Sequence, residues 1–381
     1  MKKKKAVIIA NTVYQIIVAI QLTMTKLRHM EVDLLISDHS QNVLKYVDSG
    51  KQAKIFHDIQ YIESMEYARR DGKYAKSDIL HEWLFIFKRF YEVKKIVNHI
   101  PDYDIMIAAN FDSFTFALYD TIKFLKNKNV RFYMYEDGLS TYQSFEGRLN
   151  NNRKELIKGQ FASIYKLTGY GGLVRENKGV FLFNPDMFAW RDKITKYRIP
   201  KIDKSNKEII HILNTFFDYR HREGEFQNKK IIFFEESFYA DSYKVNDIHL
   251  LNTISECVGK ENILIKLHPR SRKNRFKGYD IYENSSIPWE VVYLNNDFQD
   301  IELVSISSGS IIHPFILFGD TKKMVVLQDM ANISVVGADR VYQKFLKDNV
   351  FSKYPDIYCV IENEKMLKDY FCKVKGNAES E

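Results

Sequence analysis

Short apolar runs alternate with longer amphipathic segments along this 381-residue chain, and this alternation limits its fold more than any other feature. Each apolar run is short enough for a buried strand, and the intervening segments space their apolar residues as a helix does. In the first half, the predicted elements are strand Ala6–Ala10, helix 12–27, strand Val32–Ile36, helix 79–99, strand Tyr103–Ala109, helix 113–126 and strand Val130–Tyr135. Strands that alternate with helices predict a parallel, doubly wound sheet.

A second series of the same kind follows an irregular middle region, 147–228, in which only Glu208–Phe217 is predicted to be helical. Its predicted elements are strand 230–234, a helix around 245–258, strands at 262–267, Val291–Leu294 and Leu303–Ile306, a helix from about 309, and strand Met324–Leu327. The chain is too long for one ordinary core. We therefore expect an α/β protein with Rossmann-like domains at 1–200 and 229–381 and a linker at 201–228, with the last helix free to pack back on the first domain.

The net charge of +8 and the pI of about 9.0 favour an anionic partner, although Lys and Arg are scattered among acidic residues. On charge alone, nucleic acid, anionic lipid and sugar nucleotides remain open. Nucleic-acid readers concentrate their basic residues in a stripe with interleaved aromatic residues, and the sequence shows no such stripe. We therefore expect no nucleic-acid partner.

The apolar runs and the cysteines bear on location. No run reaches the roughly 18 apolar residues of a membrane-spanning helix. Lys2–Lys5 followed by Ala6–Ala10 resembles the start of a signal peptide, but Asn11 interrupts the run and no small-residue cleavage site follows. Those lysines suit peripheral contact with an anionic membrane. The cysteines lie far apart without a CxxC pattern, which argues against a zinc site or a disulfide framework and favours a reducing compartment; they are Cys257, Cys359 and Cys372.

The chemically most informative segment is 263–270, which reads Ile-Leu-Ile-Lys-Leu-His-Pro-Arg. Pro269 ends the apolar strand, because proline cannot donate to the ladder. His268 therefore lies near the carboxyl end of a strand, where open α/β sheets bind ligands. Lys266 and Arg270 flank it, so the segment suits an anionic substrate whose leaving group needs a proton or a hydrogen bond. The alternative is a structural histidine that ends the strand and bonds to a neighbouring carbonyl.

Two further polar motifs follow predicted strands. Glu136-Asp137-Gly138 puts carboxylates at a strand end, on a turn that needs the backbone freedom of glycine. This motif is either a base or acceptor-binding acid, or a polar turn that caps the next helix. The segment Ser305-Ile-Ser-Ser-Gly-Ser310 opens a predicted helix, where hydroxyl groups and free amides can bind a phosphate or carboxylate. Its alternative, a serine N-cap, is compatible with anion binding.

Other polar residues follow the first strand of each half. Glu235, Glu236 and Asp241 come after strand 230–234, and any of them could be a base, whereas Thr12 and Gln15 lie in the first strand-to-helix turn. The chain has no P-loop, HExxH or GxSxG motif, and no DxD-type pair that would clamp a metal and a diphosphate. These absences suit a donor with a single phosphate, and we expect no metal and no cofactor.

Taken in order, Thr12-Val-Tyr-Gln15, Glu136-Asp137-Gly138, Lys266-Leu-His-Pro-Arg270 and Ser307-Ser-Gly-Ser310 resemble the bacterial GT-B sialyltransferases. The closest resemblance is to the lipooligosaccharide or capsule type, glycosyltransferase family 52, and it covers about residues 6–330. It implies a GT-B fold, with two Rossmann-like domains facing a central cleft. It also implies an inverting transfer of sialic acid from CMP-sialic acid to a galactose hydroxyl of a surface glycan.

The same resemblance implies roles for individual residues. His268 protonates or hydrogen-bonds the CMP phosphate, which the serine motif binds. The base is Asp241, as in the lipooligosaccharide type, or Asp137, as in other sialyltransferase families. The proline expected before Asp241 is absent here. The implied substrate-binding residues are Thr12, Gln15, Glu136, Gly138, Lys266, Pro269, Arg270, Ser307, Ser308, Gly309 and Ser310.

The expected partners are a sugar-nucleotide donor and a glycan acceptor, with a homodimer left open. The expected location is the cytoplasm, with peripheral contact at the inner face of the membrane. One alternative is a related GT-B transferase that uses another sugar nucleotide. Another, from a different class, is a non-catalytic basic protein that binds nucleic acid or anionic membrane.

Overall fold

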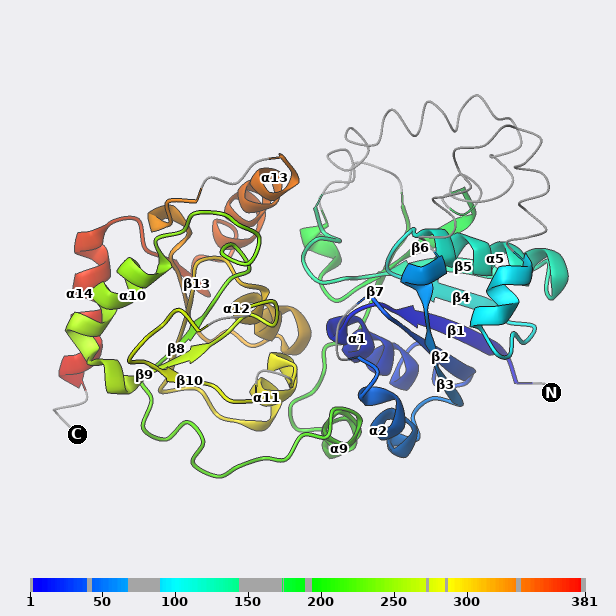
Figure 1. Ribbon diagram of the computed structural model, residues 1–381, viewed down its shortest axis with the longest axis horizontal. Coiled ribbons are helices and arrows are strands. Elements are labelled where there is room, and N and C mark those ends of the chain that lie inside the picture. Colours follow the sequence, from blue (N-terminus) through cyan, green and yellow to red (C-terminus); the bar gives the residue numbers. More distant parts are fainter. Residues whose placement is uncertain are drawn as a thin grey trace. The chain divides into compact units, whose positions relative to one another are not determined.

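The chain forms two compact units, Met1–Tyr219 and Arg220–Glu381 (Figure 1). The computed structural model describes residues 3–39, 43–67, 90–143, 173, 175–188, 194–271, 274–284, 287–333 and 337–377. Each unit is built on a parallel sheet with helices, which confirms the predicted α/β class with two Rossmann-like domains. The boundary between the units lies inside the segment predicted as a linker.

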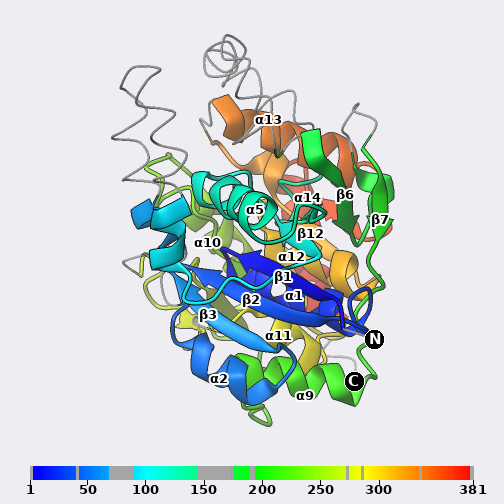
Figure 2. The same ribbon diagram turned by 90° about the vertical axis from the view of Figure 1, so that its right-hand side faces the viewer.

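The first unit contains a seven-stranded parallel sheet in the order β3-β2-β1-β4-β5-β6-β7. Its elements are β1 (Lys5–Ala10), α1 (Val13–Met24), β2 (Glu31–Ser37), α2 (Tyr46–Ala53), β3 (Asp58–Ile62), β4 (Ile105–Ala108), α5 (Ser113–Leu125), β5 (Arg131–Tyr135), β6 (Asn177–Leu182), β7 (Lys196–Arg198) and α9 (Lys207–Phe216). In both views α5 lies on one face of the sheet and α1, α2 and α9 lie on the other (Figures 1 and 2). The strand order reverses between β1 and β4, the position at which doubly wound sheets bind ligands.

Most predicted elements of the first unit are present, with ends shifted by a few residues. The predicted helix 79–99 lies largely outside the described residues, although 90–96 are helical. The irregular region expected at 147–228 contains two unpredicted strands, β6 and β7, that extend the sheet. Strand β7 has only three residues and lies at the sheet edge with exposed charged side chains, so no apolar run marks it.

The second unit contains a six-stranded parallel sheet in the order β10-β9-β8-β11-β12-β13. Its elements are β8 (Ile231–Phe234), α10 (Asp247–Val258), β9 (Ile263–Lys266), β10 (Asp280–Ile281), α11 (Trp289–Asn295), β11 (Glu302–Ser305), α12 (Gly309–His313), β12 (Met324–Val326), α13 (Gly337–Leu346), β13 (Tyr358–Val360) and α14 (Glu364–Asn377). The strand order reverses between β8 and β11, which gives this sheet its own ligand-binding edge.

The strand predicted at Val291–Leu294 is wrong, because these residues belong to the helix α11. Val291 and Val292 have no solvent exposure, and Trp289 packs edge-on against Phe234. A short run that is apolar on every side fits a fully buried helix as well as a buried strand, so periodicity cannot separate the two. Pro288 lies at the N-cap of α11, directly before the first helical residue.

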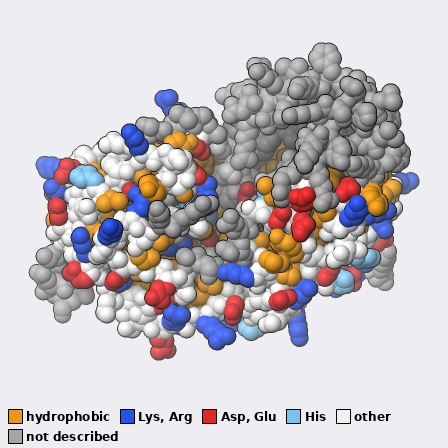
Figure 3. Space-filling view, in the orientation of Figure 1, with side chains coloured by type: hydrophobic (Ala, Val, Ile, Leu, Met, Phe, Trp, Pro, Cys, Tyr) orange, Lys and Arg blue, Asp and Glu red, His pale blue; other side chains and the backbone are white. Residues whose placement is uncertain are grey.

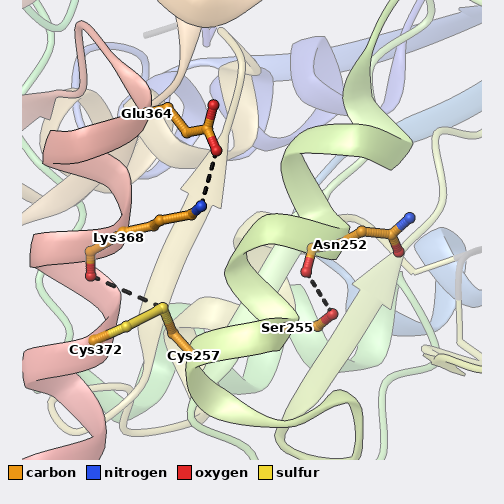
Figure 4. The surroundings of a disulfide bond; sticks show 6 residues. All are labelled: Asn252, Ser255, Cys257, Glu364, Lys368 and Cys372. Carbon is orange, nitrogen blue, oxygen red and sulfur yellow. Dashed lines mark hydrogen bonds and ion pairs between the residues drawn. A yellow bond between two sulfur atoms is a disulfide. The ribbon is translucent and has the colours of Figure 1, made fainter.

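The structure also contradicts the expectation of unpaired cysteines. Cys257 on α10 and Cys372 on α14 form a disulfide, with their Cα atoms 4.8 Å apart (Figure 4). The two residues are 115 positions apart and meet because α14 packs against α10 within the second unit. Cys359 is free. The disulfide removes the argument from cysteine usage for a reducing compartment, because disulfides are rare in the cytosol.

Two surface properties bear on the expected partners. On the face shown in Figure 3, the described Lys and Arg side chains are interspersed with Asp and Glu, which agrees with the scattered charge of the sequence. Within the described ranges, every helix is too short or too polar to cross a membrane.

Candidate active site

The carboxyl edge of the second sheet gathers most of the predicted site. Strand β9 ends at Lys266, and the next residues carry His268 into a loop. The backbone N–H of Arg270 donates to Nδ1 of His268 at 3.2 Å, so Nδ1 is an acceptor and the ring proton is assigned to Nε2. Burial and the charges of Arg270 and Lys266 lower the pKa of His268 to about 4, although Asp241 opposes them. At neutral pH the imidazole is therefore uncharged and can donate a hydrogen bond through Nε2.

The loop around His268 is held by a buried carboxylate, Glu235, which directly follows β8. Its Oε2 accepts from the backbone N–H of His268 at 3.1 Å and from the Ser271 hydroxyl at 2.5 Å. Its Oε1 accepts from Arg275 at 3.1 Å, and Arg275 also pairs with the buried Asp247. Every Glu235 oxygen therefore has a partner inside the unit. The residue positions the loop, although the sequence had suggested it as a base.

The next residue, Glu236, holds the serine motif in the same way. Its Oε1 accepts from the backbone N–H of Ser307 at 2.7 Å and from the Ser305 hydroxyl at 3.0 Å. Removal from solvent raises the pKa of the Glu236 carboxyl to about 7, against the hydrogen bonds from these serines, which lower it. The Ser308 side chain accepts from the backbone N–H of Ser310 at 3.2 Å and caps α12, as the serine N-cap alternative predicted.

Asp241, a candidate base, lies on the loop after β8. Its Oδ1 forms an ion pair with Arg270 Nη1 at 2.7 Å, and the two side chains are 34% and 61% exposed. The following residue, Ser242, has a φ of 67°, so this turn is in the left-handed region that non-glycine residues seldom adopt. Asp241 also lies close enough to His268 to affect its pKa. The structure therefore brings Asp241, His268 and Arg270 together.

In the first unit, Glu136 occupies a fully buried position after β5. Its Oε1 accepts from the Tyr14 hydroxyl at 2.5 Å, and its Oε2 accepts from the Tyr142 hydroxyl and from the Phe183 backbone N–H. Burial raises the pKa of Glu136 against these hydrogen bonds, and burial lowers the pKa of the nearby Lys201 to about 8. The side chain has no solvent exposure, so these contacts assign it a positioning role, and the predicted contact with substrate stays untested.

The remaining predicted residues of the first unit shape the same sheet edge. Gly138 has a φ of 63°, which explains the need for glycine in this turn. The Asp137 backbone N–H donates to the Thr141 hydroxyl at 2.6 Å, and Asp137 itself is half-buried. Thr12 caps α1 by accepting from the Gln15 N–H at 3.2 Å. Gln15 is buried, and its Oε1 accepts from the backbone N–H of Asn11 at 2.6 Å.

Each unit thus collects its own set of predicted residues at the carboxyl ends of its strands. The first set is Thr12, Gln15, Glu136, Asp137 and Gly138, and the second is Asp241, Lys266, His268, Pro269, Arg270, Ser307, Ser308, Gly309 and Ser310. Ser305 was predicted as part of the anion-binding segment, and the structure shows that its hydroxyl group donates to Glu236. Sequence reasoning assigned no role to Tyr14 and Tyr142, the two tyrosines that bind Glu136. The two tyrosines had no local signal, because each meets Glu136 through a contact that depends on the packing of the first unit.

Two parallel sheets of this kind, one in each Rossmann-like unit, give the chain the GT-B fold. A crystal structure of an alpha/beta-galactoside alpha-2,3-sialyltransferase from Photobacterium phosphoreum has the same fold, with a TM-score of 0.51 and 10% sequence identity; the match covers 94% of this chain and 99% of that chain. The calicheamicin glycosyltransferase CalG4 matches at a TM-score of 0.48, with 8% identity over 100% of this chain and 97% of that one. A UDP-N-acetylglucosamine 2-epimerase from Rickettsia bellii matches at 0.44, with 12% identity over 99% and 97%.

The sequence model of the family described as alpha-2,8-polysialyltransferase (POLYST) matches residues 6–327. This match spans more than half of the chain, so the protein belongs to that family and is a sialyltransferase. No curated protein sequence matches the chain. The predicted class of enzyme is confirmed, and the closer assignment to the lipooligosaccharide type stays a prediction.

Proposed function

We propose that this protein transfers sialic acid from CMP-sialic acid to a hydroxyl group of a bacterial surface glycan, with inversion at the anomeric carbon and without a metal. One observation carries the donor side of this proposal. Two adjacent glutamates after β8 hold two separate motifs at the same strand end, because Glu235 binds the His268 backbone and Glu236 binds the Ser307 backbone. The histidine loop and the serine turn are thereby placed as neighbours.

The chemistry of these two motifs suits a leaving group with one phosphate. Serine hydroxyls and backbone N–H groups at the start of a helix can bind phosphate oxygens. His268 is neutral in the free protein and donates a hydrogen bond from Nε2, rather than carrying a positive charge. Lys266 and Arg270 add positive charge, so charge that develops on the departing phosphate is stabilised without a metal.

The acceptor side needs a carboxylate that removes a proton from the attacking hydroxyl group. Asp241 and Asp137 remain the two candidates, one from each unit. Asp241 is paired with Arg270, and a donor phosphate or carboxylate that draws Arg270 away would leave Asp241 able to accept a proton. Asp137 is held by its backbone and by the left-handed Gly138, which fixes its position in the turn.

Two acceptors deserve a direct comparison. The sequence resemblance predicts a galactose hydroxyl, whereas the family to which the chain belongs is named for alpha-2,8-linked polysialic acid, which favours a terminal sialic acid. The purified protein should be incubated with CMP-sialic acid and either lactose or sialyllactose, and the products identified by mass spectrometry and NMR. Transfer to neither acceptor, with CMP release no faster than without protein, would refute the proposal.

Nucleotide specificity tests the alternative that another sugar nucleotide is the donor. Calorimetry with CMP, UDP and GDP should show binding of CMP alone. Tighter binding of UDP or GDP would move the protein to a different donor within the GT-B class. A role in lipooligosaccharide or capsule synthesis, a cytoplasmic location with peripheral membrane contact, and a homodimer stay predictions, which cell fractionation and sedimentation can test.

A further inference from the structure

A buried carboxylate and a histidine meet beneath the serine turn of the second unit. Glu290 lies on α11, and His313 is the last residue of α12. Nδ1 of His313 lies 2.5 Å from Oε1 of Glu290, and the side chains are 13% and 10% exposed. Burial raises the pKa of Glu290, but the hydrogen bond from His313 and the charges of His313 and Lys266 outweigh it and hold that pKa below its usual range.

The opposite edge of the imidazole faces the start of the serine turn. A Cβ atom built on Gly309 would lie 3.0 Å from both Cε1 and Nε2 of His313. Gly309 directly follows the N-cap residue Ser308, so the ring packs against the backbone of the turn proposed to hold the donor phosphate. A side chain at position 309 would therefore press on the ring and require it to shift by a few tenths of an ångström.

Lys266 completes the cluster at the end of β9. The residue is only 7% exposed. Burial lowers the pKa of Lys266, and the charge of Glu290 opposes this effect. The positive charge of Lys266 lowers the pKa values of both Glu290 and His268, so Lys266 lies within electrostatic reach of both residues.

We propose that His313, oriented by Glu290, is a positioning residue for the phosphate of the donor nucleotide. The inference rests on the proposed function and adds two residues that no motif had indicated. Nδ1 of His313 donates a hydrogen bond to Oε1 of Glu290, which fixes the ring directly behind the serine turn. The ring also supports the turn sterically through its contact with Gly309.

The variant Glu290→Gln tests the proposal, because CMP binding should change in opposite directions depending on whether Glu290 acts directly on the phosphate or through His313. If Glu290 acted only as a negative charge near a phosphate, Glu290→Gln would strengthen CMP binding. If Glu290 acts through His313, the same change weakens the hydrogen bond that holds the His313 ring, so CMP binding weakens. His313→Asn retains a polar group near the position of Nδ1 but removes the edge that faces Gly309.

The experiment is calorimetry with CMP and with cytidine, which lacks the phosphate. We expect His313→Asn and Glu290→Gln each to weaken CMP binding by about tenfold, as for a lost charge-assisted contact, and to change cytidine binding less than about twofold. His249→Asn, at an exposed histidine on α10, should change neither affinity. In transfer assays, the donor KM should rise while the acceptor KM stays constant.

Gly309→Ala provides a variant that removes neither charge. Its new Cβ presses on the His313 ring, so CMP binding should weaken, and the added loss should largely disappear in the Gly309→Ala/His313→Asn double variant because asparagine is smaller. Equal loss of CMP and cytidine binding, unchanged CMP binding, or tighter binding in Glu290→Gln would each overturn the inference. Failure of the wild-type protein to bind CMP would instead refute the proposed function.

Discussion

Glu236 links the stability of the second unit to pH, and its effect can be worked out in sign and size. Its pKa rises from 4.5 to about 7 on folding, because the carboxyl group is removed from solvent. The folded state therefore favours the protonated form, so stability is lost as the pH rises above 4.5, and the loss is complete above pH 7. At about 1.4 kcal/mol per pH unit, this loss is about 3 kcal/mol. The residue keeps some solvent contact, which makes this value an upper limit.

The variant Glu236→Gln isolates this effect. Glutamine cannot ionise, but its carbonyl oxygen can still accept from the Ser307 backbone and the Ser305 hydroxyl. Urea denaturation from pH 4 to pH 8 should show the variant gaining stability relative to the wild type as the pH rises, by up to about 3 kcal/mol. The exposed Glu283→Gln is the matched control and should show no such trend. A wild-type-to-variant difference that stays constant across this range would refute the reasoning.

Four further predictions concern the reaction. The double variant Ser307→Ala/Ser308→Ala should weaken CMP binding by about 1–3 kcal/mol in calorimetry, through lost hydrogen bonds to a charged group, and unchanged affinity would contradict this. His268→Ala should lower turnover by about 10²–10⁴ while the melting temperature is retained, and near wild-type turnover would exclude its role. Asp241→Asn should collapse kcat with CMP binding intact, whereas Asp137→Asn should mainly raise the acceptor KM; the reverse pattern moves the base to Asp137. EDTA should leave the transfer rate unchanged, and a loss restored by Mg²⁺ or Mn²⁺ would show that a metal is required.

The sequence by itself determined the layered architecture, because that information is local. Strands such as Ala6–Ala10 and 262–267 are short apolar runs ended by polar residues or proline, and helix 113–126 carries an apolar stripe. Alternation of the two predicts parallel sheets, and a parallel sheet has only one edge at which strand-end residues gather. His268 and the serine motif were therefore placed at a ligand-binding edge before any contact was known.

Only the tertiary structure decided how these residues are held and which side chains meet. The sequence did not show that Val291–Leu294 is helical, because a segment buried on all sides lacks the apolar periodicity that distinguishes a helix from a strand. The disulfide between Cys257 and Cys372 depends on the packing of two helices that are far apart in the chain.

The same limit applies to the candidate site. Glu235 and Glu236 looked like candidate bases, but their hydrogen bonds reach residues about 30 and 70 positions away and make them supports for the two motifs. The pairing of Glu290 with His313 joins two helices of the second unit, and neither residue lies in a recognisable motif. Contacts between residues distant in sequence depend on three-dimensional packing, which local patterns do not encode.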